Sequence, residues 1–125
     1  MAKRILIVED EKPFHDIYKV MLEGKGYDII CAYDGNEAMK EIQQEKPDLI
    51  ITDIVMNTVS GDTFVLYIKG MPEYADVPVI VVSSFSQKNY KSLKEIDPNL
   101  VYLNKADLTK KRLLEEVDKK LGTYI

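Results

Sequence analysis

The chain has 125 residues, of which 46% are hydrophobic and 30% charged, and its formal net charge is −4 at pH 7. This length suits one globular domain, so we expect a single domain over residues 1–125. The net negative charge argues against nucleic acid as the main partner, and no apolar stretch approaches the roughly 20 residues of a membrane span. The single cysteine cannot form an internal disulfide, which favours a cytoplasmic protein without membrane association.

The first part of the chain predicts a strand, a helix and a second strand. An apolar run predicts a strand over residues 3–8, and apolar side chains then recur with helical spacing. These helical positions are Phe14, Ile17, Tyr18, Met21 and Leu22. Pro13 suits the first turn of this helix, and the single histidine, His15, falls on its predicted solvent side. The second strand is expected over residues 28–33, with Cys31 as a small core residue.

The middle of the chain continues the alternation. Asp34 begins a turn that can cap a short helix. The inward positions of that helix are Ala38, Met39 and Ile42. Three apolar β-formers at residues 49–51, opened by Pro47-Asp48, predict a buried strand of a parallel sheet. A helix is expected after Gly61, and its inward positions are Phe64, Tyr67, Ile68 and Met71.

The last third predicts a strand over residues 78–82, a weakly amphipathic helix over 87–96 and a strand over 100–103. Asp107 is the predicted N-cap of a final helix. The inward positions of that helix are Leu113, Leu114, Val117 and Leu121. Five strands thus alternate with five helices. Because strand–helix–strand crossovers are right-handed, this order predicts an α/β fold with a parallel sheet between two helical layers.

Polar side chains follow four of the predicted strands. In chain order they are Glu9, Asp10, Asp53, Ser83, Ser84 and Lys105. The carboxyl ends of parallel strands meet at one edge of a sheet, where ligands bind, so we expect these side chains to converge. Three crowded carboxylates repel one another unless a cation lies among them. With no cysteine or histidine in the set, the oxygens suit a hard cation, and Mg²⁺ best if phosphate is also bound.

The remaining members of the set suit a phosphoryl group. Lys105 offers a point charge for a phosphate oxygen, and the hydroxyl of Ser83 offers a hydrogen bond. The role left for Asp53 is that of a nucleophile, since a carboxylate can carry an aspartyl-phosphate.

This set resembles the receiver domain of two-component response regulators, of the stand-alone kind found in chemotaxis regulators. Four blocks match the family in order and spacing: Val8-Glu9-Asp10-Glu11, Asp53-Ile54-Val55-Met56 through Gly61, Val81-Val82-Ser83-Ser84 and Tyr102-Leu103-Asn104-Lys105. The resemblance covers essentially the whole chain. It implies a flavodoxin-like doubly wound sheet with strand order 2-1-3-4-5 and three α/β/α layers.

By this resemblance, Asp53 accepts a phosphoryl group from a phosphohistidine on a sensor histidine kinase or a histidine phosphotransfer protein. The family pattern implies that Mg²⁺ is held by Asp10, Asp53 and the backbone carbonyl of Val55, with Glu9 reaching it directly or through water. Lys105 would pair with the phosphoryl group. Such a domain is a phosphoacceptor rather than an enzyme, apart from its own phosphorylation and dephosphorylation.

The resemblance also implies a route for the signal. Ser83 would move to bind the phosphoryl group, and Tyr102 would swing inward behind it. The change would appear on the face made by the fourth helix, the fifth strand and the fifth helix. We expect a downstream target protein to bind there, whether the chain acts alone or as a receiver within a longer protein.

Two positions depart from the family pattern. Asn57 stands where a proline is usual four residues after the acceptor, and Ala106 replaces the proline that usually follows the lysine. A cis bond costs about 0.5–1 kcal/mol before proline but about 2.5–4 kcal/mol elsewhere. We therefore predict a trans Lys105–Ala106 bond, with Asn104 and Asp107 reshaping the loop.

Three alternatives stay open. A flavodoxin-like nucleotide binder needs a phosphate loop after the first strand, but Glu9-Asp10-Glu11 repels phosphate. An aspartate-nucleophile phosphatase needs a second acid just behind Asp53, where Val55 stands. A receiver-like scaffold that is no longer phosphorylated is favoured slightly by Ala106, whereas the intact acids and Lys105 count against it.

Overall fold

The structure is a computed structural model that describes residues 2–53, 61–84 and 94–122. The strands are β1 (Arg4–Val8), β2 (Asp28–Ala32), β3 (Leu49–Thr52), β4 (Val79–Ser83) and β5 (Val101–Asn104). The helices are α1 (Lys12–Met21), α2 (Gly35–Gln44), α3 (Gly61–Lys69) and α5 (Lys110–Leu121), and a 3₁₀ turn, η1 (Lys105–Asp107), precedes α5. Most of the helix predicted over 87–96 lies outside the described residues, although residues 94–96 are helical. Within the described ranges no helix has the length and apolar character that crossing a membrane requires.

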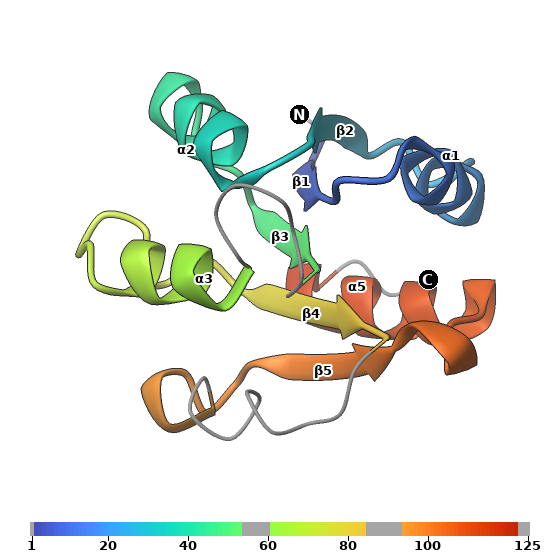
Figure 1. Ribbon diagram of the computed structural model, residues 1–125. Coiled ribbons are helices and arrows are strands. Elements are labelled where there is room, and N and C mark those ends of the chain that lie inside the picture. Colours follow the sequence, from blue (N-terminus) through green and yellow to red (C-terminus); the bar gives the residue numbers. More distant parts are fainter. Residues whose placement is uncertain (1, 54–60, 85–93, 123–125) are drawn as a thin grey trace.

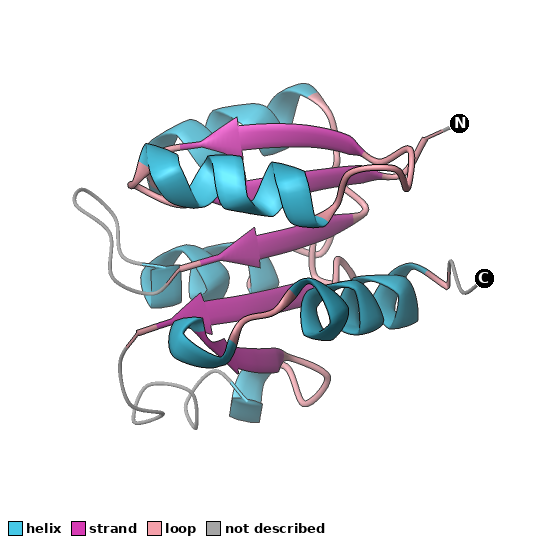
Figure 2. Ribbon diagram, turned by 90° about the vertical axis from the view of Figure 1, so that its right-hand side faces the viewer, coloured by secondary structure: helices cyan, strands magenta, loops and turns pink. Residues whose placement is uncertain are grey.

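The five strands form one parallel sheet in the order β2-β1-β3-β4-β5. The arrows that can be followed in Figure 2 point the same way, as a parallel sheet requires. Parallel neighbours need crossover connections, and here the crossovers place α2 and α3 on one face and α1 and α5 on the other (Figure 1). The predicted α/β fold, with the doubly wound strand order 2-1-3-4-5, is confirmed.

The sheet separates two hydrophobic clusters. Side chains of a strand point alternately to its two faces, so Ile5 and Ile7 join the cluster beneath α1 and α5. Leu6 and Val8 join the cluster beneath α2 and α3. Because both faces are covered, the central strands must be apolar at consecutive positions, which explains their uninterrupted runs. Cys31 in β2, predicted as a small core residue, is only half-buried.

The inward face of α1 differs from the prediction. Tyr18 and Leu22 are buried, but Ile17 is 40% exposed and His15 is only 1% exposed. Positions 15, 18 and 22 also lie on one helical face, so apolar spacing alone did not decide between Ile17 and His15. Burial of the histidine depends on a partner from outside the helix, the carbonyl oxygen of Glu9, which lies 2.6 Å from Nε2.

The inward face of α3 also needs a correction. Phe64 and Ile68 are buried as predicted, whereas Tyr67 is 58% exposed and Val65 takes its place in the core. Position 65 follows 64 by one residue and precedes 68 by three, so it lies on the same face. The aliphatic residue is buried, and the tyrosine keeps its hydroxyl-bearing ring in water.

The N-cap of α5 is Thr109 and not the predicted Asp107. The Thr109 hydroxyl accepts a hydrogen bond from the Arg112 amide at 3.1 Å. Asp107 belongs to η1, which forms because the Asn104 side chain caps the Ala106 amide at 2.9 Å. This extra turn uses residues 105–107 and delays the start of the helix. The inward positions are borne out, with Leu113 and Val117 fully buried and Leu114 and Leu121 partly buried.

Candidate functional site

Three carboxylates meet at the carboxyl edge of the sheet. Glu9 and Asp10 follow β1 and Asp53 follows β3, and these strands are parallel neighbours with Val8 opposite Thr52. The Asp53 amide donates to the Val8 carbonyl at 3.0 Å, which extends the pairing of β1 and β3 by one residue, to Asp53. One carboxylate oxygen from each acid lies within 4.8 Å of the others. The acidic trio predicted from the sequence is therefore assembled.

The ammonium of Lys105 lies between two of these acids. Its Nζ is 2.9 Å from Asp53 Oδ2 and 2.6 Å from Glu9 Oε1. The lysine follows β5, and β4 separates this strand from β3, which carries Asp53 at its end. Its side chain is 8% exposed, that of Glu9 is 1% exposed and that of Asp53 is 8% exposed. The site is thus a partly desolvated group of charges in which one ammonium offsets part of the repulsion.

The loop that presents Lys105 has the predicted peptide geometry. No cis peptide bond occurs among the described residues, so the Lys105–Ala106 bond is trans. Asn104 shapes this loop by capping the Ala106 amide, as the sequence predicted. Asp107 is exposed, and the Leu108 amide closes the turn on the Lys105 carbonyl at 3.3 Å.

Burial and charge shift the pKa values of this group. Burial raises the pKa of Glu9 to about 7, and Lys105 opposes that rise, while Asp10 and Asp53 add to it. Burial lowers the pKa of Lys105, but its bonds to Asp53 and Glu9 outweigh burial and leave the pKa above its ordinary value. The acids therefore favour any cation that enters among them, because it relieves the same repulsion.

Glu9 is expected to lower the free energy of unfolding as the pH rises from about 4.5 to about 7 without Mg²⁺. The pKa of Glu9 rises from 4.5 to about 7 on folding, so the folded chain binds more protons than the unfolded chain in this window. The stability due to protonated Glu9 is present at low pH and is lost as the pH passes about 7. Glu9→Gln should gain stability relative to wild type across the window, by at most about 3 kcal/mol.

Urea unfolding of both proteins with a chelator, below and above this window, measures the difference. Burial lowers the pKa of His15, so this residue makes the free energy of unfolding rise with pH, opposite to the effect of Glu9. Because both proteins contain His15, its effect is absent from the difference between them. A difference between the two proteins that does not change with pH would contradict the assignment to Glu9.

The acidic cluster fits a hard divalent cation. All its donors are carboxylate oxygens, it carries three acids against one lysine, and two of the acids are buried. Glu9 Oε2 already accepts a hydrogen bond from the Glu11 amide at 3.1 Å, so the orientation of this carboxylate is fixed. Val55, whose carbonyl is the fourth predicted ligand, and Asn57 lie outside the described residues.

Ser83 and Tyr102 lie on the neighbouring strands β4 and β5. Ser83 is the last residue of β4, fully buried, and pairs with Asn104, while Ser84 is exposed. Tyr102 is half-buried and pairs with Val81, two residues before Ser83. Because side chains two residues apart share a face, Ser83 and Tyr102 point to the same side of the sheet.

Sequence reasoning missed two residues of α1 that contact this site. The ring centroid of Phe14 lies 3.8 Å from Lys105 Nζ. His15 Nε2 carries the proton and donates to the carbonyl oxygen of Glu9, because a carbonyl oxygen can only accept. The His15 ring also packs against Tyr33, with 4.6 Å between the two ring centroids. The position of His15 three residues before Tyr18 was a signal of burial. No signal in the sequence connects Phe14 with Lys105.

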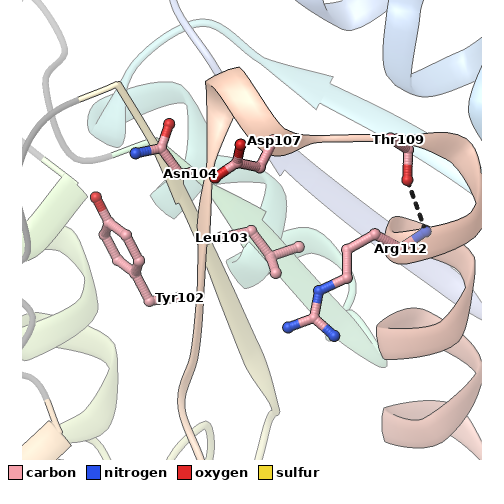
Figure 3. Close-up of a pocket in the computed structure, with 6 residues that line it drawn as sticks. All are labelled: Tyr102, Leu103, Asn104, Asp107, Thr109 and Arg112. Atoms are coloured by element: carbon pink, nitrogen blue, oxygen red, sulfur yellow. Dashed lines mark hydrogen bonds between the residues drawn. The ribbon is translucent and has the colours of Figure 1, made fainter.

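A separate pocket of about 450 Å³ lies between β5, η1 and the start of α5 (Figure 3). It is lined by Tyr102, Leu103, Asn104, Asp107, Thr109 and Arg112. None of these described lining residues belongs to the acidic trio. Tyr102 therefore borders a space distinct from the carboxylates.

Comparison with known proteins places the chain in a family. The protein-family model of the response regulator receiver domain matches residues 5–117. The receiver domain of a signal transduction histidine kinase from Syntrophus aciditrophicus is 29% identical, with a TM-score of 0.86, and the match covers 97% of this chain and 91% of that chain.

Two further solved structures, both less than 25% identical, share the fold. Chemotaxis protein CheY4 from Vibrio cholerae is 23% identical, with a TM-score of 0.86 over 97% of this chain and 100% of that chain. The receiver domain of a sensor histidine kinase from Pseudomonas aeruginosa PAO1, which has a magnesium ion coordinated in its active-site cleft, is 22% identical, with a TM-score of 0.85 over 98% of this chain and 100% of that chain. With the family match over residues 5–117 and the acidic cluster at the strand ends, the chain belongs to the response regulator receiver domain family.

Proposed function

We propose that Asp53 is the phosphoacceptor of this receiver and takes its phosphoryl group from a phosphohistidine on a sensor histidine kinase or a histidine phosphotransfer protein. Receiver domains partner with histidine kinases and are typically phosphoacceptor signalling domains rather than catalytic enzymes. The observation that carries the proposal is the placement of Asp53 Oδ2 beside Lys105 Nζ, at 2.9 Å, within the acidic cluster.

The transfer is a displacement at phosphorus. A carboxylate oxygen of Asp53 forms a bond to phosphorus, the phosphorus–nitrogen bond to the histidine breaks, and the electron pair returns to the imidazole, which takes up a proton. Lys105 binds a phosphoryl oxygen, for which its position between Asp53 and Glu9 already suits it. Glu9, Asp10, Asp53 and the Val55 carbonyl would hold Mg²⁺, which supplies charge neutralisation for the phosphoryl oxygens.

A small phosphodonor tests this proposal without a kinase. Acetyl phosphate with Mg²⁺ should add one phosphoryl group, seen as a single mass increment that alkali removes, as expected for an acyl phosphate. Borohydride reduction followed by peptide mass spectrometry should map the modification to position 53. Absence of any label with several such donors would favour the alternative, a receiver-like scaffold that is not phosphorylated.

The proposed signal passes through Ser83 and Tyr102. A phosphoryl group adds roughly −1.5 to −2 of charge and three acceptor oxygens, and the buried Ser83 hydroxyl would move to bind one of them. Tyr102, on the same face of the sheet, would fill the space behind it. The change would reach the face made by β5, α5 and the helix predicted over residues 87–96, where a downstream target protein would bind.

Ser83→Ala is expected to permit phosphorylation while reducing the response at β5 and α5. The variant removes the hydroxyl that would draw Ser83 toward the phosphoryl group, and it leaves Asp53 and Lys105 in place. Amide NMR shifts along α5, recorded with and without acetyl phosphate, measure the response. Equal shifts in wild type and Ser83→Ala would contradict the coupling.

A further inference from the structure

We propose that Phe14 is a positioning residue for Lys105. Its aromatic face holds the Lys105 ammonium while that ammonium exchanges carboxylate partners for phosphoryl oxygens. This inference rests on the proposed function of Asp53 and adds to it Phe14, which the sequence pattern placed only on the inward face of its helix.

The geometry is that of a cation over an aromatic ring. Lys105 Nζ lies 3.8 Å from the Phe14 ring centroid, well within the roughly 6 Å over which the ring attracts a cation. The side chain of Lys105 is 8% exposed, so little water screens the interaction. The free energy of a cation–π interaction is largest at desolvated positions such as this one.

Phe14 is itself well placed to be a fixed support. It lies in the first turn of α1 directly after Pro13, whose ring restricts the backbone. The Phe14 amide donates to the Glu11 carbonyl at 3.1 Å, and the side chain packs at the edge of the cluster beneath α1 and α5. The ring therefore keeps its place independently of the charges in the site.

The two acids that contact the Lys105 ammonium change their role in the reaction, unlike Phe14. Glu9 and Asp53 bind Lys105 now, but Asp53 would carry the phosphoryl group, and both acids belong to the cluster that suits a cation. A phenyl ring neither titrates nor binds Mg²⁺, so it is the contact that persists through the exchange.

Two substitutions at position 14 separate the effect of the aromatic ring from the effect of the apolar bulk of the side chain. With acetyl phosphate at saturating Mg²⁺, Phe14→Leu should phosphorylate about tenfold more slowly than wild type, and Phe14→Tyr should stay within about twofold. The dissociation constant for Mg²⁺ should change by less than about twofold in both variants, since neither alters an acid. Ile17→Leu, at an exposed position of the same helix, is the matched control and should match wild type.

A double variant tests whether Phe14 acts through Lys105. In a Lys105→Met background, Phe14→Leu should cause no further loss of rate, because the cation that the ring holds is absent. Proton NMR reports whether the Lys105 side chain lies over the ring in solution. The Lys105 ε-methylene resonance, shielded by the ring in wild type, should lose its upfield shift in Phe14→Leu and keep it in Phe14→Tyr.

The outcomes distinguish this inference from the proposed function. If wild type were phosphorylated and Phe14→Leu were equally fast, or if Leu and Tyr were equally slow, the positioning role would be wrong while the function of Asp53 stood. If wild type took no label, the function would fail, and the ring-current shift would still decide whether Phe14 holds the ammonium. Absence of that shift in wild type would overturn the inference.

Discussion

Asp53→Asn is expected to abolish phosphorylation by acetyl phosphate. The amide keeps the size of the side chain and an oxygen beside Lys105, but it lacks the carboxylate charge that attacks phosphorus. Intact-mass spectrometry after incubation with the donor and Mg²⁺ should show no added phosphoryl group in this variant, against one in wild type.

The control for this experiment is Asp76→Asn. Asp76 is exposed, pairs with Lys46 at 3.1 Å and precedes β4, at the opposite edge of the sheet from the acidic cluster. The same chemical change there should leave labelling intact. A label that persists in Asp53→Asn, or that maps to Ser83 or His15, would refute the assignment of the phosphoacceptor.

Asp10→Asn is expected to weaken Mg²⁺ binding severely. Loss of groups that merely orient metal ligands costs about 10- to 100-fold in affinity, and loss of a carboxylate from the cluster itself should cost at least as much. The chain has no tryptophan, so calorimetry or NMR titration of residues at the strand ends is the suitable measurement. Phosphorylation by acetyl phosphate should then require far higher Mg²⁺.

Asp16→Asn makes the same change in net charge outside the cluster. Asp16 lies on the exposed side of α1 and pairs with Lys12 at 3.3 Å. Its removal should leave the Mg²⁺ affinity close to that of wild type. Unchanged affinity in Asp10→Asn would remove that carboxylate from the proposed metal site.

Much of the fold was predictable from local patterns in the sequence. The apolar runs that became β1, β3 and β4 are consecutive rather than alternating, as burial on both faces requires. Asp34 caps α2 as predicted, with its Oδ1 accepting from the Glu37 amide at 2.8 Å. These predictions succeeded because each depends on residues within one segment of the chain.

The convergence of Glu9, Asp10, Asp53 and Lys105 was also predictable, for a reason of topology. Parallel strands end at one edge, so the residues just after them meet whatever the intervening sequence. This rule names the residues of the site but not their contacts. It does not say that Lys105 pairs with Glu9 as well as Asp53, or that burial raises the pKa of Glu9 to about 7.

The remaining features depend on atoms from distant parts of the chain. Apolar spacing did not decide between His15 and Ile17 in α1, and the carbonyl of Glu9 supplies the partner with which His15 is buried while Ile17 stays exposed. The Phe14–Lys105 contact joins residues on separate elements, α1 and η1, that only the packing of α1 and α5 on one face brings together. The sequence by itself thus determined the elements and the acids of the site. The tertiary structure decided which side chains surround them, because a buried polar or charged group takes its place from a partner that no local pattern encodes.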